Sequence, residues 1–246
     1  MSTRTPQRVA LVGGGSGGIG QAVVHRLAAD GYAVAVHYAG NQSTADGMVA
    51  AILAKGGHAI AVGGDIADET AMEAAFDAVE EAFGGIDVVV NTAGIMALGP
   101  IADYDLDAFD RIIRTNVRGT FVISQQAARR VRPGGAIINF STSVTRAQFP
   151  GYGPYAASKA AVEGLTLILA RELRGKDITA NTVAPGPTAT PLFLHGKDEQ
   201  TIANLAQAVP LERLGRPDDI AETVAFLAGP ARWVNGQTLY TNGGLA

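Results

Sequence analysis

Cysteine is absent from the 246 residues, which excludes disulfide bridges, a thiolate nucleophile and cysteine-based metal sites. Long apolar runs are also absent: none approaches the roughly 18 residues of a membrane span. The N-terminal segment MSTRTPQRVALV reaches glycine too soon to offer the apolar region of a signal peptide. We therefore expect a cytoplasmic protein without a membrane partner.

Positive charge is scarce: 19 Lys and Arg stand against 23 Asp and Glu. A net charge of −4 lacks the broad positive field that nucleic acid requires, so we expect no nucleic-acid partner. The densest basic cluster, Arg129, Arg130 and Arg132, precedes Pro133-Gly134-Gly135 and is typical of a helix C-terminus. The four histidines lack metal-ligand spacing, so no metal site is predicted.

Short apolar runs alternate with segments of helical period, a pattern that predicts βαβ units and a parallel sheet. The expected strands are Val9–Val12, Ala33–His37, Ala59–Val62, Asp87–Val90, Ala136–Phe140, Thr179–Val183 and Thr238–Tyr240. The expected helices begin near Gly18, Thr44, Glu69, Leu106, Pro154 and Asp218, with another near 199–207. We predict a single doubly wound, Rossmann-type α/β domain over 1–246, with about seven strands flanked by helices. Residues 185–208 are expected as an inserted substrate loop.

Glycine is plentiful, with 31 residues, and it concentrates in Gly13-Gly14-Gly15-Ser16-Gly17-Gly18-Ile19-Gly20. This run lies between the first expected strand and a helix. Glycines there let the backbone approach a pyrophosphate at the helix N-terminus. The pattern G-x-G-x-x-G fits from Gly13 and again from Gly15, and a flexible loop without a ligand is the alternative.

An acidic residue would hold the ribose 2′-hydroxyl of NAD at the end of the second strand. That segment reads His37-Tyr38-Ala39-Gly40-Asn41-Gln42-Ser43 and has no carboxylate. Asn41 and Ser43 could instead donate hydrogen bonds to a 2′-phosphate. The sequence therefore favours NADP(H), with NAD(H) as the alternative and no nearby arginine to decide between them.

Tyr155 and Lys159 are four residues apart at the start of an expected helix, so they share a face. A free tyrosine has a pKa of roughly 10, too high for efficient acid–base work near neutrality. A neighbouring ammonium would stabilise the phenolate and lower that pKa. The pair could then donate a proton to a carbonyl oxygen, whereas chance spacing on a helix is the alternative.

These motifs occur in one order along Val9–Gly244, and together they resemble the short-chain dehydrogenase/reductase family. The markers are Gly14-x-x-x-Gly18-x-Gly20, Asp65-Ile66, Asn91-Thr92-Ala93-Gly94, Asn116, Tyr155-x-x-x-Lys159 and Pro185-Gly186. The resemblance implies that Tyr155 is the acid/base, that Lys159 lowers its pKa, and that Asn116 anchors a water. It also implies a cofactor site formed by Gly14, Ser16, Gly18, Ile19, Gly20, Tyr38, Asn41, Ser43, Asp65, Ile66, Asn91, Ala93, Gly94, Tyr155, Lys159, Pro185, Gly186 and Thr188.

Two positions depart from the family pattern. Gly13 replaces a threonine whose hydroxyl braces the glycine turn, so the turn is expected to be less rigid. The family's catalytic serine lies thirteen residues before the tyrosine, and in this sequence Thr142 occupies that position. Ser143 would take that role if the loop shifted by one residue, so both hydroxyls stay candidates.

Within the family, the chain resembles 3-oxoacyl-acyl carrier protein and tetrahydroxynaphthalene reductases. The supporting stretches are His37–Asn41, Pro210–Ile220 and Asn235–Leu239. This resemblance implies NADP(H) and a homotetramer. Arg146 and Lys197 are the only basic residues expected near the pocket mouth, which favours a general carbonyl reductase over one dedicated to an acidic carrier protein. The residues expected to touch a small-molecule carbonyl or alcohol substrate are Ile95, Met96, Gln148, Tyr152, Leu192 and Phe193.

The sequence thus predicts NADPH-dependent reduction of a ketone or aldehyde to an alcohol, with hydride from nicotinamide and the proton from Tyr155. An NAD-dependent alcohol dehydrogenase working in oxidation is the second reading. A catalytically silent nucleotide-binding sensor or scaffold is a third, since a fold does not by itself imply a function.

Overall fold

The computed structural model describes residues 7–246. The expected lack of a leader segment rests partly on residues 1–6, which lie outside the described part. Within residues 7–246, no helix is both long enough and apolar enough to cross a membrane.

Seven parallel strands form one sheet in the order β3-β2-β1-β4-β5-β6-β7, which confirms the predicted fold class. They are β1 (Val9–Gly13), β2 (Ala33–Tyr38), β3 (Ala59–Gly63), β4 (Ile86–Asn91), β5 (Val131–Phe140), β6 (Thr179–Pro185) and β7 (Thr238–Thr241). The chain builds outwards from β1 to β3 and then crosses back to place β4 on the other side of β1. Strand order reverses there, and open α/β sheets bind ligands at the carboxyl ends of such strands.

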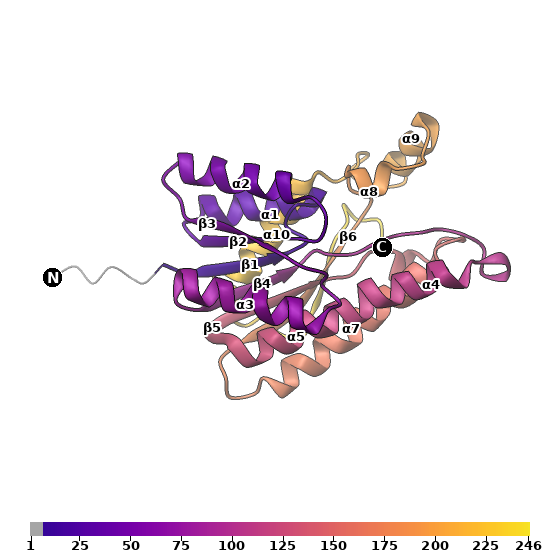
Figure 1. Cartoon of the computed structure of the whole chain (residues 1–246). Coiled ribbons are helices and arrows are strands. Elements are labelled where there is room, and N and C mark those ends of the chain that lie inside the picture. The colour runs from indigo at the N-terminus through magenta and orange to yellow at the C-terminus, as the bar shows by residue number, and fades with distance from the viewer. Residues whose placement is uncertain (1–6) are drawn as a thin grey trace.

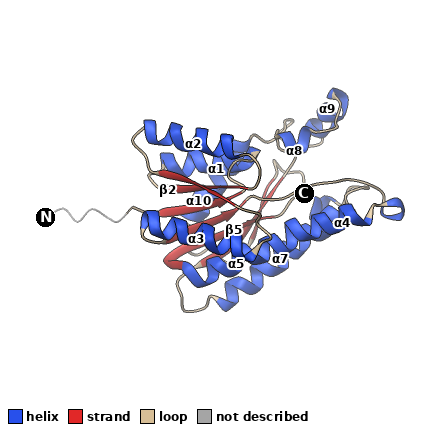
Figure 2. Ribbon diagram, in the orientation of Figure 1, coloured by secondary structure: helices blue, strands red, loops and turns tan. Residues whose placement is uncertain are grey.

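Helices cover both faces of the sheet (Figures 1 and 2). On one face lie α1 (Gly18–Ala29), α2 (Gln42–Ala54) and α10 (Pro217–Ala228), and on the other α3 (Glu69–Phe83), α5 (Gly119–Arg130) and α7 (Gly153–Glu172). Alternate residues of β1 serve the two layers: Ala10 and Val12 face the first, whereas Val9 and Leu11 face the second. Burying one large aliphatic side chain stabilises the folded state by about 1.5–3 kcal/mol. A sheet with a core on each face is therefore most stable when its strands are apolar throughout.

The helix expected from Leu106 is interrupted. α4 (Leu106–Ile112) passes directly into a π-helical turn, η2 (Ile113–Arg118), which continues into α5. A π turn adds a residue to a helical turn, and such turns are frequent at functional sites. This one contains Asn116, whose surroundings are described below.

The basic cluster at the end of α5 is used for ion pairs within the chain. Arg130 pairs with Asp77 and with Glu80, the latter at 2.6 Å, and Arg132 pairs with Asp87. β5 begins at Val131, five residues before the expected start, and its register against β4 is irregular between Ile86 and Val88.

The segment expected as the substrate loop projects from the carboxyl edge of the sheet (Figure 1). It contains two helices, α8 (Pro191–Leu194) and α9 (Glu199–Gln207). Two further short helices, η1 (Ile101–Asp103) and α6 (Val144–Ala147), follow β4 and β5. Of these short helices, α6, α8 and α9 contribute side chains to the wall of the site.

Candidate active site

Two hollows meet at the carboxyl edge of the sheet. The larger is a cleft of about 650 Å³ over the ends of β1, β2 and β4, and the smaller is a pocket of about 120 Å³ between the end of β5, α7 and α8. The residues that line both are Ile19, Thr92, Gly94, Thr190 and Leu192. The hollows therefore adjoin and share part of their wall, as the sites of a cofactor and its substrate would.

The glycine turn after β1 leaves no room for side chains. Gly14 has φ +69°, and a Cβ on Gly20 would lie 2.2 Å from the carbonyl oxygen of Gly14. The turn is nevertheless braced, because the Thr92 hydroxyl donates to the carbonyl oxygens of Gly13 and Gly14 at 2.8 and 3.2 Å. No side chain caps the N-terminus of α1. Its backbone N–H groups are thus available to an anion such as a pyrophosphate.

Asp65 and Ile66 line the cleft beyond this turn, as the family pattern expects. Burial opposes ionisation of Asp65, but hydrogen bonds from the Ala67 backbone and the Arg114 side chain outweigh it and lower the pKa of Asp65. Arg114 also lines the cleft. Sequence reasoning missed Arg114 because it lies 49 residues from its partner.

The cleft wall after β2 is formed by Ala39, Gly40 and Asn41, without a carboxylate. The Asn41 side chain is exposed and makes no capping hydrogen bond to α2. Tyr38 and Ser43 do not line the cleft. The Tyr38 ring packs over Gly63, and Ser43 is exposed in the first turn of α2.

Asn91 is also absent from the cleft wall, since its side chain is buried beneath it. Its Nδ2 donates to Thr120 at 3.0 Å, and its Oδ1 accepts from the Ala93 backbone at 3.2 Å. Asn91 therefore holds the end of β4, while Ala93 and Gly94 themselves face the cleft.

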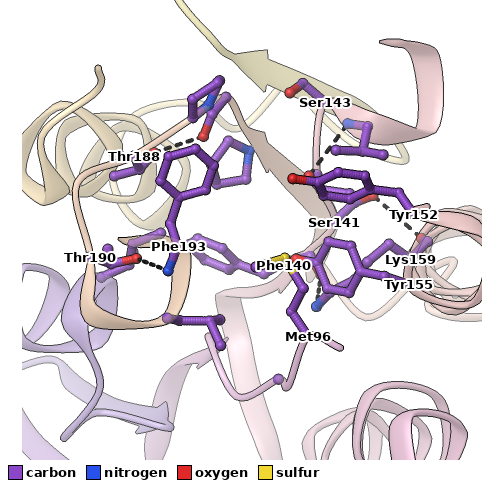
Figure 3. A pocket seen from close by; sticks show the side chains of 18 of the residues that line it. Met96, Phe140, Ser141, Ser143, Tyr152, Tyr155, Lys159, Thr188, Thr190 and Phe193 are labelled. Carbon is purple, nitrogen blue, oxygen red and sulfur yellow. Dashed lines mark hydrogen bonds between the residues drawn. The ribbon is translucent and has the colours of Figure 1, made fainter. Parts of the chain in front are cut away.

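Tyr155 and Lys159 lie one helical turn apart on α7, and both line the pocket (Figure 3). Lys159 is 4% exposed, and its Nζ donates to the carbonyl oxygen of Phe140 at 2.9 Å. The Nζ lies 6.0 Å from the centroid of the Tyr155 ring. The predicted pair is thus brought to one site, with Lys159 fixed to the end of β5.

The expected lowering of the tyrosine pKa is wrong for this structure. Burial raises the pKa of Tyr155 to about 12, although a hydrogen bond with Thr142 acts in the opposite direction. Burial also lowers the pKa of Lys159 to about 8, because the charged ammonium is withdrawn from water. The Lys159 ammonium donates to the Phe140 carbonyl and not to the phenol. The effect of burial on the pKa of Tyr155 therefore outweighs any effect of the lysine charge.

Both candidate hydroxyls, Thr142 and Ser143, line the pocket, and Thr142 is the one that acts to lower the pKa of the Tyr155 phenol. Ser143 is buried at the N-terminal end of α6, where its backbone N–H donates to Pro185 at 2.9 Å. In Figure 3, Ser143 lies apart from Tyr155 and Lys159. The geometry therefore favours Thr142 as the partner of the tyrosine.

Asn116 is fully buried in the π turn and reaches across to the segment after β4. Its Oδ1 accepts from the Ile95 backbone and its Nδ2 donates to the Ile95 carbonyl, both at 2.9 Å. Its Nδ2 also lies 3.0 Å from the Ser158 hydroxyl on α7. A Cβ on Gly94 would lie 3.1 Å from the Lys159 Nζ and 3.3 Å from the Asn116 Oδ1, so these two groups converge on Gly94 and leave little room for a larger residue.

Glu163 was missed by sequence reasoning and lies one turn beyond Lys159 on α7. Its carboxylate accepts from the hydroxyls of Ser141 and Thr145 at 2.6 and 3.0 Å. The same Thr145 hydroxyl lies 2.9 Å from the carbonyl oxygen of Thr142. Glu163 thus fixes the chain on both sides of Thr142.

The remaining pocket wall is mostly apolar. Of the six expected substrate contacts, Met96, Tyr152, Leu192 and Phe193 line the pocket. Ile95 lines the cleft, and Gln148 is exposed and lines neither hollow. Pro185, Gly186 and Thr188 are also in the pocket wall, together with five apolar residues that were not expected: Phe140, Val144, Phe149, Pro187 and Leu205.

The two basic residues expected near the pocket mouth have contacts of their own. The Arg146 guanidinium lies 3.8 Å from the centroid of the Tyr240 ring, and the Lys197 ammonium donates to the Phe193 carbonyl. Within residues 7–246, no cluster of three or more His, Asp or Glu side chains could hold a metal ion.

The fold and the site together define a dinucleotide-dependent oxidoreductase. A phosphate-binding turn at a topological switch point opens onto a pocket that holds a tyrosine, a lysine and a hydroxyl. Such a pocket can polarise a carbonyl oxygen and exchange a proton with it.

Comparison with known proteins gives the family. A family model described as enoyl-(acyl carrier protein) reductase matches residues 14–246. A short-chain type dehydrogenase/reductase of Picea abies is 43% identical, covering 96% of this chain and 92% of its own. A 3-oxoacyl-[acyl-carrier-protein] reductase of Staphylococcus aureus is 41% identical, and the match covers 96% of this chain and 97% of that protein. A short chain dehydrogenase from Burkholderia cenocepacia in complex with NADP is 41% identical, with a TM-score of 0.90 and 98% of each chain covered. The chain belongs to the short-chain dehydrogenase/reductase family and is an NAD(P)-dependent enzyme.

Proposed function

We propose that this enzyme reduces a ketone or aldehyde to an alcohol with NADPH, with Tyr155 as the proton donor. The observation that carries the proposal is that Tyr155, Lys159 and Thr142 line one pocket, which shares part of its wall with the cofactor cleft. When bound, NADPH supplies the hydride that is added to the carbonyl carbon.

The chain's own residues then control the carbonyl oxygen. The hydroxyls of Thr142 and Tyr155 donate hydrogen bonds to it, which stabilises the negative charge that develops there. Tyr155 transfers its phenolic proton to that oxygen, so the carbonyl becomes an alcohol and the tyrosine becomes a phenolate. The Lys159 ammonium stabilises this phenolate until a proton returns from solvent through the buried groups around Asn116.

NADP(H) fits this cleft better than NAD(H) does. The wall after β2 presents the Asn41 amide and no carboxylate that would repel a 2′-phosphate. The carboxylate of Asp65, further along the cleft, is neutralised by Arg114. The similar Burkholderia cenocepacia enzyme was solved with NADP, which also supports this cofactor.

The apolar pocket wall favours a carbonyl compound with hydrophobic substituents over a substrate carried on an acidic protein. Arg146 stacks on Tyr240, and Lys197 is bonded to Phe193, so both basic groups near the mouth already have partners. We therefore favour a general carbonyl reductase.

A panel of ketones and aldehydes, followed by NADPH absorbance and repeated with NADH, tests the proposal. Tyr155→Phe is expected to abolish turnover while NADPH still binds, because only the proton donor is removed. Tyr152→Phe, at a second tyrosine in the same pocket, is the matched control and should keep most activity. Undiminished turnover by Tyr155→Phe would exclude the mechanism, and preference for NADH would exclude the cofactor assignment.

We further propose that the protein is a homotetramer, because apolar side chains are exposed on two separate surfaces. One surface lies on α5 and α7 and includes Phe121 and Ile168. The other includes Phe226 of α10 and the fully exposed Trp233. Two self-complementary surfaces suffice to close a tetramer with 222 symmetry. The cytoplasmic location stays a prediction.

A further inference from the structure

His37 is a buried histidine that the proposed reaction does not use. It is the penultimate residue of β2, is 1% exposed, and lies beneath the cofactor cleft. Its Nδ1 is 3.2 Å from the backbone nitrogen of Gly14, whose N–H donates to it. A ring nitrogen that accepts a hydrogen bond carries no proton. The imidazole is therefore neutral, with its proton on Nε2.

Gly14 is the first residue after β1, and its backbone has the left-handed conformation instead of the extended conformation of a strand. Its φ is +69°, and a Cβ there would lie 2.8 Å from the Ala93 backbone. Its carbonyl oxygen accepts from the Gly17 backbone at 2.9 Å and from the Thr92 hydroxyl at 3.2 Å. Its N–H is held by His37. Both polar groups of this one residue are thus fixed by the structure around it.

We propose that His37 is a positioning residue of the cofactor site, whose neutral imidazole holds the glycine turn in the shape that receives the cofactor pyrophosphate. This inference rests on the proposed function only in taking the cleft to be the cofactor site. It also explains why the turn is braced although Gly13 provides no hydroxyl. Thr92 and His37 hold it from outside the turn instead.

The surroundings of His37 keep it neutral. Burial lowers its pKa to about 4, and the nearby Gly64 backbone and Asp65 carboxylate offset only part of that effect. Its Nε2 is buried and has no hydrogen-bond partner within residues 7–246. Only the Nδ1 is therefore engaged, and near pH 7 it keeps the lone pair that accepts from Gly14.

Asparagine and leucine separate the hydrogen bond from packing. The Oδ1 of asparagine can take the place of the Nδ1, whereas leucine fills a similar volume without an acceptor. His58, exposed at the amino end of β3 and remote from the cleft, provides the matched control. The variants are His37→Asn, His37→Leu and His58→Leu, each made in the full chain.

NADPH binding is measured by fluorescence titration, at a temperature where circular dichroism shows every variant to be folded. We expect His37→Leu to raise the Kd for NADPH about tenfold, since a mispositioned turn loses contacts equivalent to about one hydrogen bond. His37→Asn and His58→Leu should stay within about threefold of the unsubstituted protein. The inference is overturned if His37→Leu binds NADPH normally, or if His37→Asn is weakened equally, because packing would then be responsible.

A second measurement does not depend on the fold of His37→Leu. In the unsubstituted protein without cofactor, labelled with ¹⁵N in its histidine rings, the His37 signal should report a bare Nδ1 and a protonated Nε2 at pH 7. The signal is assigned by its loss in His37→Asn, and a proton on Nδ1 would overturn the inference. If the unsubstituted protein binds neither NADPH nor NADH, the proposed function fails instead.

Discussion

Thr142 and Ser143 are adjacent hydroxyl residues with different surroundings. Thr142 acts to lower the pKa of the Tyr155 phenol, whereas the Ser143 backbone is held against Pro185 at the start of α6. The branched Cβ of threonine restricts its rotamer, which suits a hydroxyl that must stay directed at one oxygen. The hydroxyl that orients the substrate should therefore be that of Thr142.

Substitution separates these two hydroxyls. Thr142→Val keeps the branched shape and removes the hydroxyl, so kcat should fall about 100-fold, as on loss of one donor to a developing oxyanion. Ser143→Ala should stay within about threefold, and Thr142→Ser should remain active. Steady-state kinetics with one good ketone checks this. A larger loss in Ser143→Ala than in Thr142→Val would assign the role to Ser143.

The ionisation of Lys159 predicts the pH dependence of reduction. Its pKa is lowered to about 8, so the ammonium is charged below that pH and neutral above it. The pKa of Tyr155 is raised to about 12, so the phenol keeps its proton throughout. The kcat/KM for reduction should therefore fall as pH rises through about 8, because a neutral lysine no longer stabilises the phenolate. Circular dichroism from pH 6 to 10 excludes unfolding, and a flat rate profile over that range contradicts the prediction.

At the scale of elements, α7 carries the residues proposed for the reaction on one face. Tyr155, Lys159 and Glu163 follow at intervals of four; Lys159 contacts the last residue of β5, and Glu163 contacts the segment after it. Glu163 fixes the hydroxyls of Ser141 and Thr145, which lie on either side of Thr142. The helix therefore supports the turn that it faces.

Removing this support should slow the chemical step without weakening cofactor binding. Glu163→Ala is expected to lower kcat about tenfold, because Thr142 is then held less rigidly against Tyr155. Glu163→Gln keeps an oxygen that can accept from both hydroxyls and should lose about twofold or less. The KM for NADPH should be unchanged in both variants. Equal losses in the two would indicate that the charge, and not the acceptor oxygen, matters.

At the scale of the whole molecule, the exposed apolar surface of α5 and α7 predicts assembly. Phe121 and Ile168 are 53% and 54% exposed and line one hollow between the two helices. Phe121→Glu combined with Ile168→Glu should reduce the assembly below a tetramer, because buried unpaired carboxylates are costly. Leu53→Glu on α2, at a residue 52% exposed, is the control and should leave the assembly intact. Light scattering after size exclusion measures both, and an unchanged mass in the double variant contradicts this surface as an interface.

The sequence alone determined the fold class, all seven strands and the Tyr155–Lys159 pair. The strands could be predicted because a sheet covered on both faces buries every residue of a strand such as β1, which makes the strand apolar throughout. The pair could be predicted because two residues spaced by one helical turn share a face. The helix start predicted near Glu69 is also confirmed, and in the structure Asp68 accepts from the Ala71 backbone at that helix's N-terminus. These signals are local, so one sequence contains them.

The tertiary structure decided what depends on partners distant in sequence. Asp65 meets Arg114, Thr142 meets Tyr155, and the Gly14 N–H meets His37 only after the strands align. The π turn and the raised pKa of Tyr155 were missed for the same reason: they follow from how neighbouring elements pack and exclude water, and no local pattern encodes that. The sequence therefore predicted the proposed acid/base pair, whereas only the fold decided the pKa values of its two members and the residues that hold them in place.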